Sequence, residues 1–320
     1  MGSYLSRRLL YMVPTLLVVS IIIFGLVRMV PGDIIDQIVA EMATQSGASG
    51  TIDRAAIEKR LGLDVPVWQQ YWRWFSGVVT GDLGESFTGF GTVADKIAGR
   101  LPVTFELGLL SIVVGLIVAI PIGIYSAVRQ NSVGDYVGRT TAIAFMSVPN
   151  FWVGTMVMIY PAVWFRWSPP MEVVAFTDDP LGNLGIFIIP SIVLGLALAG
   201  STMRMTRTMM LEVLRQDFIR TAWSKGLREK IVIIRHATRN ALIPVVTWVG
   251  FQIPMLVGGA VVTETIFGLP GMGRLLVDAL AQRDYPVVTG VALIIAVFVV
   301  VVNLLIDLTY AWLDPRARQE

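Results

Sequence analysis

The chain has 320 residues, of which 55% are hydrophobic and only 15% are charged, whereas a soluble domain carries about 25% charged residues. This composition excludes a disordered chain and argues against a single soluble globule. The chain has no cysteine, which excludes a disulfide scaffold and thiol catalysis, and its single histidine makes zinc or histidine-based catalysis a poor hypothesis.

Six apolar stretches are long enough to cross a membrane, which takes about 20 residues of helix. They comprise residues 9–27, 101–128, 141–165, 186–203, 242–263 and 287–312. Prolines interrupt five of them, which membrane helices tolerate when neighbouring helices satisfy the freed carbonyl groups. We therefore predict an all-α integral membrane protein with six transmembrane helices in a packed, kinked bundle.

The first span lies in an N-terminal region of residues 1–30. Arg7 and Arg8 precede the apolar run, as in a signal peptide, but the run ends in RMVPGD without a small-residue cleavage site. We therefore expect an uncleaved first span.

An outer loop of residues 31–100 follows, with a predicted helix at 55–61. An aromatic cluster comes next, made of Trp68, Tyr71, Trp72, Trp74 and Phe75. Tryptophan and tyrosine are enriched at membrane surfaces, so the favoured interpretation is that these rings lie at the lipid interface. The alternative is that they dock a partner or line a substrate entrance.

The distribution of positive charge predicts the orientation. An even number of spans places both termini on one side, and that side carries fifteen of the 25 basic residues but only six acidic ones. Basic loops remain in the cytoplasm. We therefore expect both termini, including the tail 314–320, and the loop 204–241 to be cytoplasmic.

The loop 204–241 lies within a predicted five-helix core of residues 101–313. Asp217 is a candidate N-cap and Gly226 a candidate left-handed helix end, so a short helix is predicted between them, with a second helical stretch at 229–243. The first helix is too short and too polar to cross a membrane, and it can present a surface to a soluble partner. The alternative is a basic loop that touches anionic lipid headgroups.

Small residues recur every four positions in the second span, which favours close helix packing. They are Ser111, Gly115, Ala119, Gly123 and Ala127. The chain contains no G-x-x-x-x-G-K-[ST] motif for ATP, and we interpret the glycine-rich run GLPGMGR at 268–274 as a tight turn.

Polar groups inside membrane spans are candidates for function by default. Glu106 lies in the second span, and Asp307 lies one turn after Asn303 in the sixth. Asn150, in the segment SVPNFWVG, joins them as a candidate. We favour a role in helix networks over a translocation path for these residues.

Several segments together resemble the permeases of ATP-binding cassette importers, and more narrowly the first (B-type) permease subunit of the dipeptide/oligopeptide/nickel group. The resemblance runs nearly end to end and rests on RRLLYMVPTLLVVSIIIFGLVRMVPGD, GDLGESF, RLPVTFELGLLS, SVPNFWVG, DFIRTAWSKGL, RHATRNALIPVVT, ETIFGLPGMGRLLVDAL and RDYPVVTG. The chain departs from the general signature because Arg220 stands at a position that is usually acidic and because the gap from Gly226 to Pro244 is long. Both departures resemble the peptide-group variant.

The resemblance implies a type I importer permease in a bacterial cytoplasmic membrane. It implies a heterodimer with a homologous permease, two cytoplasmic ATPase subunits that use ATP and Mg, and an extracytoplasmic binding protein that delivers di- or oligopeptides. The chain itself would be non-catalytic, would bind no cofactor, metal or nucleic acid, and would contact the lipid bilayer. The coupling helix that engages an ATPase would span 217–227. Its residues would include Asp217, Arg220, Thr221, Ala222, Lys225, Gly226 and Leu227.

Two other functions remain as alternatives. A stand-alone secondary transporter or channel for small polar solutes would favour inverted repeats and charged sites at the membrane midplane, and neither is evident. A membrane-embedded enzyme would need clustered reactive side chains, which the spans lack. The substrate stays open among dipeptides, oligopeptides, glutathione and nickel chelates.

Overall fold

A computed structural model describes residues 2–29, 54–60, 62–88, 91–166 and 173–313. These residues are mainly helical, and the one isolated β-bridge found among them joins Glu85 and Thr92. The predicted tail 314–320 and the polar start of the outer loop lie outside the described residues.

The chain divides into two compact units. Unit 1 comprises Met1–Pro102 and Arg274–Val300, and unit 2 comprises Val103–Gly273 and Val301–Glu320. Three helices, namely α5 (Val93–Val128), α12 (Met272–Ala281) and α13 (Tyr285–Leu313), contain residues of both units.

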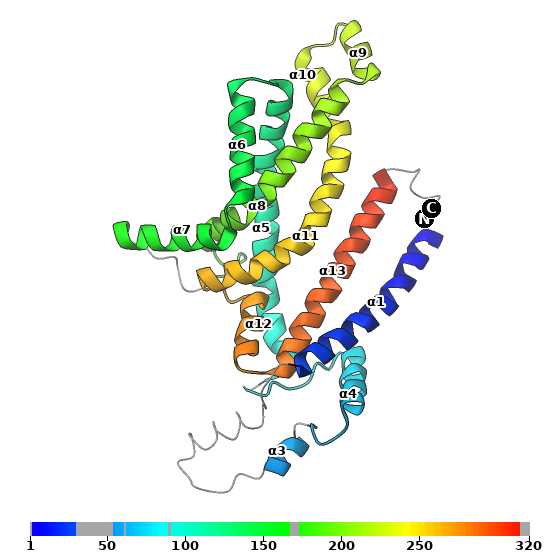
Figure 1. Ribbon diagram of the computed structural model, residues 1–320, viewed down its shortest axis with the longest axis vertical. Coiled ribbons are helices and arrows are strands. Elements are labelled where there is room, and N and C mark those ends of the chain that lie inside the picture. Colours follow the sequence, from blue (N-terminus) through cyan, green and yellow to red (C-terminus); the bar gives the residue numbers. More distant parts are fainter. Residues whose placement is uncertain (1, 30–53, 61, 89–90, 167–172, 314–320) are drawn as a thin grey trace. The chain divides into compact units, whose positions relative to one another are not determined.

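Helix α8 (Pro180–Leu214) is the centre of unit 2, where it packs against α11 (Arg239–Phe267) and α6 (Val133–Ser147) (Figure 1). Asp179 starts α8 by accepting a hydrogen bond from the Gly182 amide at 3.0 Å, and proline occupies the first helical position, where its missing N–H is harmless. A helix that is apolar all round lies either in a protein core or in a membrane. For α8, 61% of its most apolar window is buried inside the protein, against 28% for α5.

The small residues of the second span form the contact between α5 and α8. A Cβ atom at Gly115 would lie 2.9 Å from the Leu198 side chain, and one at Gly123 would lie 2.7 Å from the Thr206 Cβ atom. The prediction of close helix packing is therefore confirmed, because a larger side chain at either glycine would push the two helices apart.

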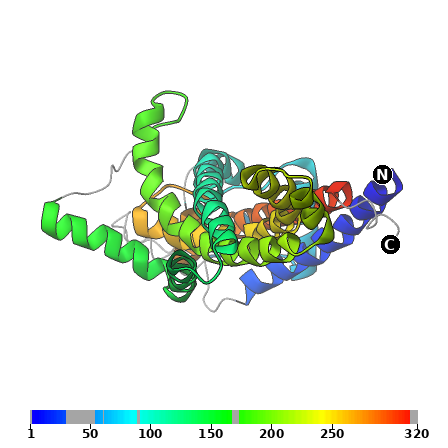
Figure 2. The same cartoon turned by 90° about the horizontal axis from the view of Figure 1, so that it is seen from above.

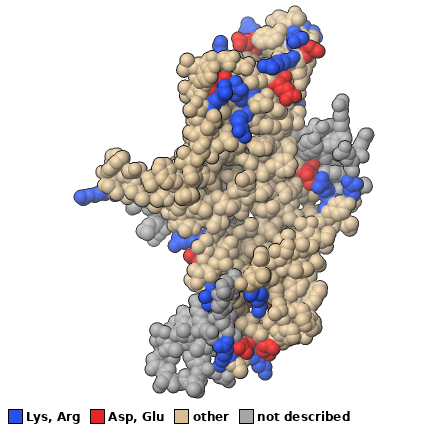
Figure 3. All heavy atoms as spheres, in the orientation of Figure 1, with Lys and Arg blue, Asp and Glu red and all other residues tan. Residues whose placement is uncertain are grey.

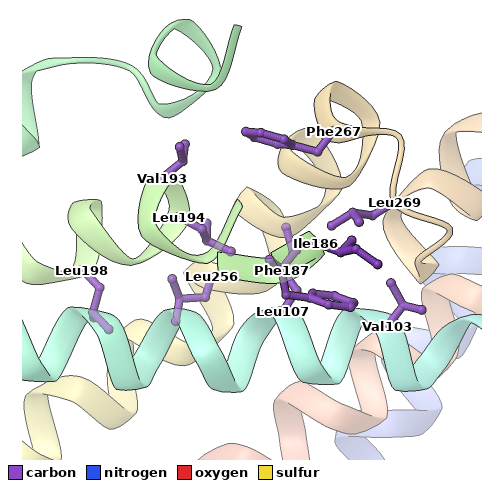
Figure 4. Packing of buried hydrophobic residues seen from close by; sticks show 11 residues of the cluster. Val103, Leu107, Ile186, Phe187, Val193, Leu194, Leu198, Leu256, Phe267 and Leu269 are labelled. Atoms are coloured by element: carbon purple, nitrogen blue, oxygen red, sulfur yellow. The ribbon is translucent and has the colours of Figure 1, made fainter. Parts of the chain in front are cut away.

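Apolar side chains from three helices fill the interior of unit 2 next to this contact. Val103 and Leu107 of α5 point toward Phe187 and Leu194 of α8, with Leu256 of α11 alongside (Figure 4). Leu107 and Phe187 are fully buried. These contacts hold the ends of α5, α8 and α11 together.

The predicted third span, 141–165, is wrong as a single helix. The structure has α6, which ends at Ser147, and α7 (Asn150–Phe165), and the two are bent by 93° (Figure 2). Pro149 has no N–H to continue the helix and it disfavours a helical conformation at Val148, which is extended with φ −89° and ψ 125°.

Five helices of the described residues are long and apolar enough to cross a membrane, or six if the bent pair counts as one span. Helices α1 (Gly2–Arg28), α5, α8, α11 and α13 cover the other five predicted spans. The all-helical fold is therefore confirmed, and the orientation of the termini stays a prediction.

Unit 1 contains α1, α3 (Arg54–Arg60) and α4 (Val67–Thr80), and α3 confirms the helix predicted at 55–61 within one residue. Phe24 of α1 contacts the rings of Tyr71 and Trp74 in α4, with centroids 5.5 and 5.6 Å apart. Part of the aromatic cluster therefore fastens α4 to α1.

A buried carboxylate, that of Asp284, connects two segments of unit 1. Asp284, in the turn between α12 and α13, accepts hydrogen bonds from Ser86 Oγ, from the Phe87 amide at 3.1 Å and from Thr88 Oγ1 at 2.9 Å. Lys96 Nζ donates to Ser86 Oγ at 2.6 Å. This network fixes the segment 86–88 to the start of α13.

Candidate functional site

The predicted loop helix is α9 (Asp217–Ser224), which follows directly on α8. The prediction that Asp217 is the N-cap is wrong, because the extended residue Gln216 precedes the helix and Asp217 occupies its first turn. Its carboxylate still favours the positive end of the helix dipole there. The prediction for Gly226 is confirmed, since its φ of 73° is the left-handed conformation that glycine adopts without strain.

One face of α9 is anchored to the rest of unit 2. Ile219 and Ala222 are buried, and they belong to an apolar cluster with Met210 and Val213 of α8. Leu227 packs against the same cluster from the exit of the helix. Because the two anchors lie three residues apart, they share one side of the helix, so α9 is held along its length.

The rest of the α9 surface is exposed, and two large rings flank the anchored face, one on each side. Phe218 is 41% and Trp223 is 45% exposed. Of the predicted coupling residues, Ala222 and Leu227 therefore belong to the anchoring side, whereas the others are exposed; these are Asp217, Arg220, Thr221, Lys225 and Gly226. Charged side chains of both signs gather around this end of unit 2, while the helices beyond it present a mostly uncharged surface (Figure 3).

The chain leaves α9 through α10 (Glu229–Ile231) and a π-helical segment, η1 (Val232–Thr238), which continues into α11. The helical stretch predicted at 229–243 is confirmed, but its π-helical form had no signal in the sequence. Val232 and Ala237 of η1 are fully buried in the cluster that anchors α9. A π-helical turn is rare and frequently occurs at functional sites.

A buried ion pair that sequence reasoning missed holds α8 near this end. Arg207 of α8 donates from Nε and Nη2 to the two carboxylate oxygens of Asp135 in α6, both at 2.8 Å. Ser126 Oγ and the Asn131 amide also donate to Asp135, which is fully buried. The pair therefore ties the α5–α6 turn to the helix that enters α9.

The other predicted site residues lie apart from α9 in the chain. Glu106 is half-buried in α5. Asn150 is the first residue of α7, directly after the bend. In α13, Asn303 is exposed and Asp307 is half-buried. Their proposed roles stay predictions.

The run GLPGMGR forms a tight turn, as predicted. Gly268 ends α11 in the left-handed conformation, with φ 69°. Glu264, which is buried, accepts a hydrogen bond from Thr104 Oγ1 at 2.5 Å, and Thr104 Oγ1 in turn accepts one from the Met272 amide at 2.7 Å. A Cβ atom at Gly271 would lie 2.2 Å from the Glu264 carboxyl carbon, so only glycine fits.

Metal chemistry finds no support in the described ranges, where no three His, Cys, Asp or Glu residues are grouped to hold an ion. What the described geometry offers is mechanical: a helix with an anchored face, two exposed rings that flank this face, and direct connections into α8 and, through η1, into α11.

Comparison with known proteins identifies the family. Residues 119–319 match the family described as binding-protein-dependent transport system inner membrane component, and residues 1–108 match its N-terminal counterpart. The chain is 40% identical to the dipeptide transport system permease protein of Escherichia coli (strain K12), with both chains fully covered. It is 40% identical to a putative peptide transport system permease protein of Brucella abortus (strain 2308), again over all of both chains. It is 38% identical to the glutathione transport system permease protein of Pectobacterium atrosepticum, over 99% of each.

A solved structure shares the fold. It is the crystal structure of an amino acid ABC transporter with histidines, with a TM-score of 0.52 and 14% sequence identity, covering 68% of this chain and 94% of the other. At this identity the likeness concerns the fold alone. The full-length matches carry the assignment, and the chain belongs to the family of binding-protein-dependent transport system inner membrane components.

Proposed function

We propose that this chain is the permease subunit of an ATP-driven importer of peptides. In this proposal it forms the translocation pathway with a homologous permease, receives substrate from an extracytoplasmic binding protein, and is driven by two cytoplasmic ATPase subunits that use ATP and Mg. The relatives named for dipeptides, peptides and glutathione support the substrate class, because all three substrates contain amide-linked amino acids.

One observation supports a role of α9 in transmitting force: one face of this helix is buried against α8, and the rest of its surface is exposed. A force applied to its exposed face reaches α8 through the buried contacts of Ile219 and Ala222. It also reaches α11 through η1, which belongs to the same apolar cluster. A rigid helix anchored in this way tilts the spans that it joins when an ATPase moves it, and we assign α9 the role of the coupling helix.

The exposed rings supply the contact with the ATPase in this proposal. Aromatic side chains dominate the binding energy of many protein interfaces, where truncation of a central ring costs about 2 kcal/mol or more. Phe218 and Trp223 therefore are the residues expected to enter a groove of the ATPase. Asp217, Arg220 and Lys225 surround them with charge that fixes the register.

The test is reconstitution of the full complex in proteoliposomes, with uptake of a labelled dipeptide and ATP hydrolysis measured together. We expect Phe218→Ala combined with Trp223→Ala to lower uptake at least tenfold while the chain still inserts. Phe176→Ala is the control, since Phe176 is also an exposed ring, at 53%, but lies outside α9. Normal uptake by the double variant would show that α9 is not the coupling helix.

Gly226→Asp and Gly226→Asn separate charge from backbone conformation at the exit of α9. No atom lies within 4 Å of a Cβ atom at Gly226, so both side chains fit sterically, and asparagine and aspartate both tolerate its left-handed conformation. We expect the aspartate variant to uncouple ATP hydrolysis from uptake and the asparagine variant to transport. Gradient-driven uptake by the chain alone would instead support a secondary transporter.

A further inference from the structure

Unit 1 contains a cavity of about 520 Å³ that neither the proposed function nor the sequence motifs explain. It lies between the end of α1, helix α4, the segment 83–87 and the start of α13. Its polar lining includes the side chains of Arg28, Gln70, Arg73, Trp74 and Glu85. All of these elements belong to the same compact unit.

The cavity lies at the depth of lipid headgroups. The apolar part of α1, Ser6–Arg28, has 23 residues and is therefore about 34 Å long, slightly more than the hydrocarbon core of about 30 Å. Arg28 ends this stretch and lines the cavity. The rings of Tyr71 and Trp74 pack one turn before it, on Phe24, and such rings occupy the membrane–water interface.

Two guanidinium groups line the cavity without a counter-ion. Neither Arg28 nor Arg73 forms an ion pair within the part of the chain that the structure describes. Arg28 instead lies over the Phe24 ring, 5.1 Å from its centroid, which restricts the position of its charge. A guanidinium held in this way matches the oxygens of a phosphate group.

One wall of the cavity is fixed by Gln70, which is only 8% exposed. Its amide nitrogen donates to the carbonyls of Leu63 at 3.4 Å and Val65 at 2.6 Å. These bonds hold the segment 63–65 against the start of α4, so the cavity keeps its shape around Arg28 and Arg73.

The lining therefore has two complementary parts. Arg28 and Arg73 offer positive charge, whereas Glu85 offers negative charge. This combination matches a ligand that carries an anion and a primary ammonium group close together, because each part of the ligand finds its opposite.

An apolar surface for acyl chains continues from the cavity along α1. Leu10, Leu17 and Ile21 lie on the same side of α1 as Arg28 and are exposed, and only 17% of the apolar window of α1 is buried. A lipid whose headgroup lies at Arg28 can extend its tails along this surface toward the membrane centre.

We propose that this cavity holds the headgroup of an aminophospholipid, with its phosphate bound by Arg28 and Arg73 and its ammonium group bound by Glu85. The bound lipid connects α1 with α4 and with the start of α13. The proposal goes beyond transport and does not depend on the identity of the cargo.

The test is native mass spectrometry of the full-length chain, released from detergent after incubation with dioleoyl-phosphatidylethanolamine, -phosphatidylglycerol or -phosphatidylcholine. We expect retention of phosphatidylethanolamine above both others. Arg28→Gln combined with Arg73→Gln should lower its occupancy about tenfold. The matched control is Lys59→Gln combined with Arg129→Gln, which removes two exposed charges that do not line the cavity, and it should retain the lipid.

Glu85→Gln tests separately whether Glu85 binds the ammonium group of the lipid. Because Glu85 is exposed, we expect this variant to keep the packing of unit 1 even if the arginine variant does not. It should reduce the preference for phosphatidylethanolamine over phosphatidylglycerol severalfold. Equal retention of the three lipids by the unmodified chain, or an unchanged preference in Glu85→Gln, would overturn the proposal. Displacement of the lipid by an equal concentration of free phosphoethanolamine would also overturn it, because the site would then take a soluble phosphate ester.

Discussion

The buried pair of Asp135 and Arg207 is the contact whose loss we expect to damage the structure most. Asp135→Asn keeps the shape of the side chain but removes its charge, which leaves the Arg207 guanidinium uncompensated. The side chains of Asp135 and Arg207 are 0% and 16% exposed, so water cannot replace the lost partner. We expect the α5–α6 turn to detach from α8 in this variant.

The magnitude follows from burial and geometry. Removing one member of a buried ion pair costs about 3–5 kcal/mol, and the pair here has two hydrogen bonds of 2.8 Å, with further donors from Ser126 and Asn131. For a chain of this length, 1 kcal/mol corresponds to about 2 °C in Tm, so we expect a loss of roughly 6–10 °C. Arg207→Met should cost a similar amount, because it leaves the carboxylate unpaired.

The assay is a double-mutant cycle on the purified chain in detergent, followed by the fluorescence of its nine tryptophans during heating. Asp135→Asn combined with Arg207→Met should lose less Tm than the two single variants added together, since no uncompensated charge remains. Asp217→Asn is the control. It breaks the pair of Asp217 with Arg220, whose side chains are 94% and 76% exposed, and solvent screens that contact.

Single variants that lose less than about 2 °C, or losses that simply add in the double variant, would refute this reasoning. In that case the pair would be accessible to water or dispensable for holding α6 against α8. A Tm loss in the Asp217→Asn control as large as in Asp135→Asn would lead to the same conclusion.

Two further predictions concern glycines at close helix contacts, and each has a control glycine with open space around it. Gly123→Ala places a Cβ atom 2.7 Å from the Thr206 Cβ atom and should destabilise the chain by about 1–3 kcal/mol. Gly108→Ala, whose Cβ atom would have no atom within 4 Å, should not destabilise it. The same heating assay measures both variants. Gly273→Ala places a Cβ atom 2.4 Å from the backbone of α11 and should lower Tm, whereas Gly258→Ala, in open space within α11, should leave it unchanged or raise it. Equal Tm values within either pair would contradict the packing described for that glycine.

The elements that sequence reasoning predicted correctly depend on neighbours along the chain. The length of an apolar stretch is a local property, so five of the predicted spans coincide with long apolar helices of the structure. The left-handed Gly226 and the tight turn at 268–274 follow from glycine's conformational freedom, which is also local. The stripe of small residues in α5 repeats with the helical period and therefore predicted a packed face.

The incorrect or missed predictions concern contacts between residues distant in the sequence, or the choice between one long apolar helix and two shorter ones. Residues 141–165 are apolar enough for one span, but the bend at Pro149 divides them into two helices, and hydropathy does not measure that bend. The π-helical form of η1 had no local signal, because its ordinary side chains suit an α-helix equally well. Sequence reasoning counted Asp135 and Arg207 only as charges of the predicted cytoplasmic side, since nothing in the sequence pairs residues 72 positions apart.

The sequence by itself therefore determined that this protein is an all-helical membrane chain, where most of its spans lie, and which segment forms the exposed loop helix, because hydrophobic length and backbone sterics act through near neighbours. Only the tertiary structure decided which face of α9 is anchored, that Asp135 contacts Arg207, and that Asp284 accepts hydrogen bonds from Ser86 and Thr88. It also decided that Arg28, Arg73 and Glu85 line one cavity at the end of α1. Burial and ion pairing depend on which distant residues the packing of the helices brings into contact, and no local sequence pattern specifies those contacts.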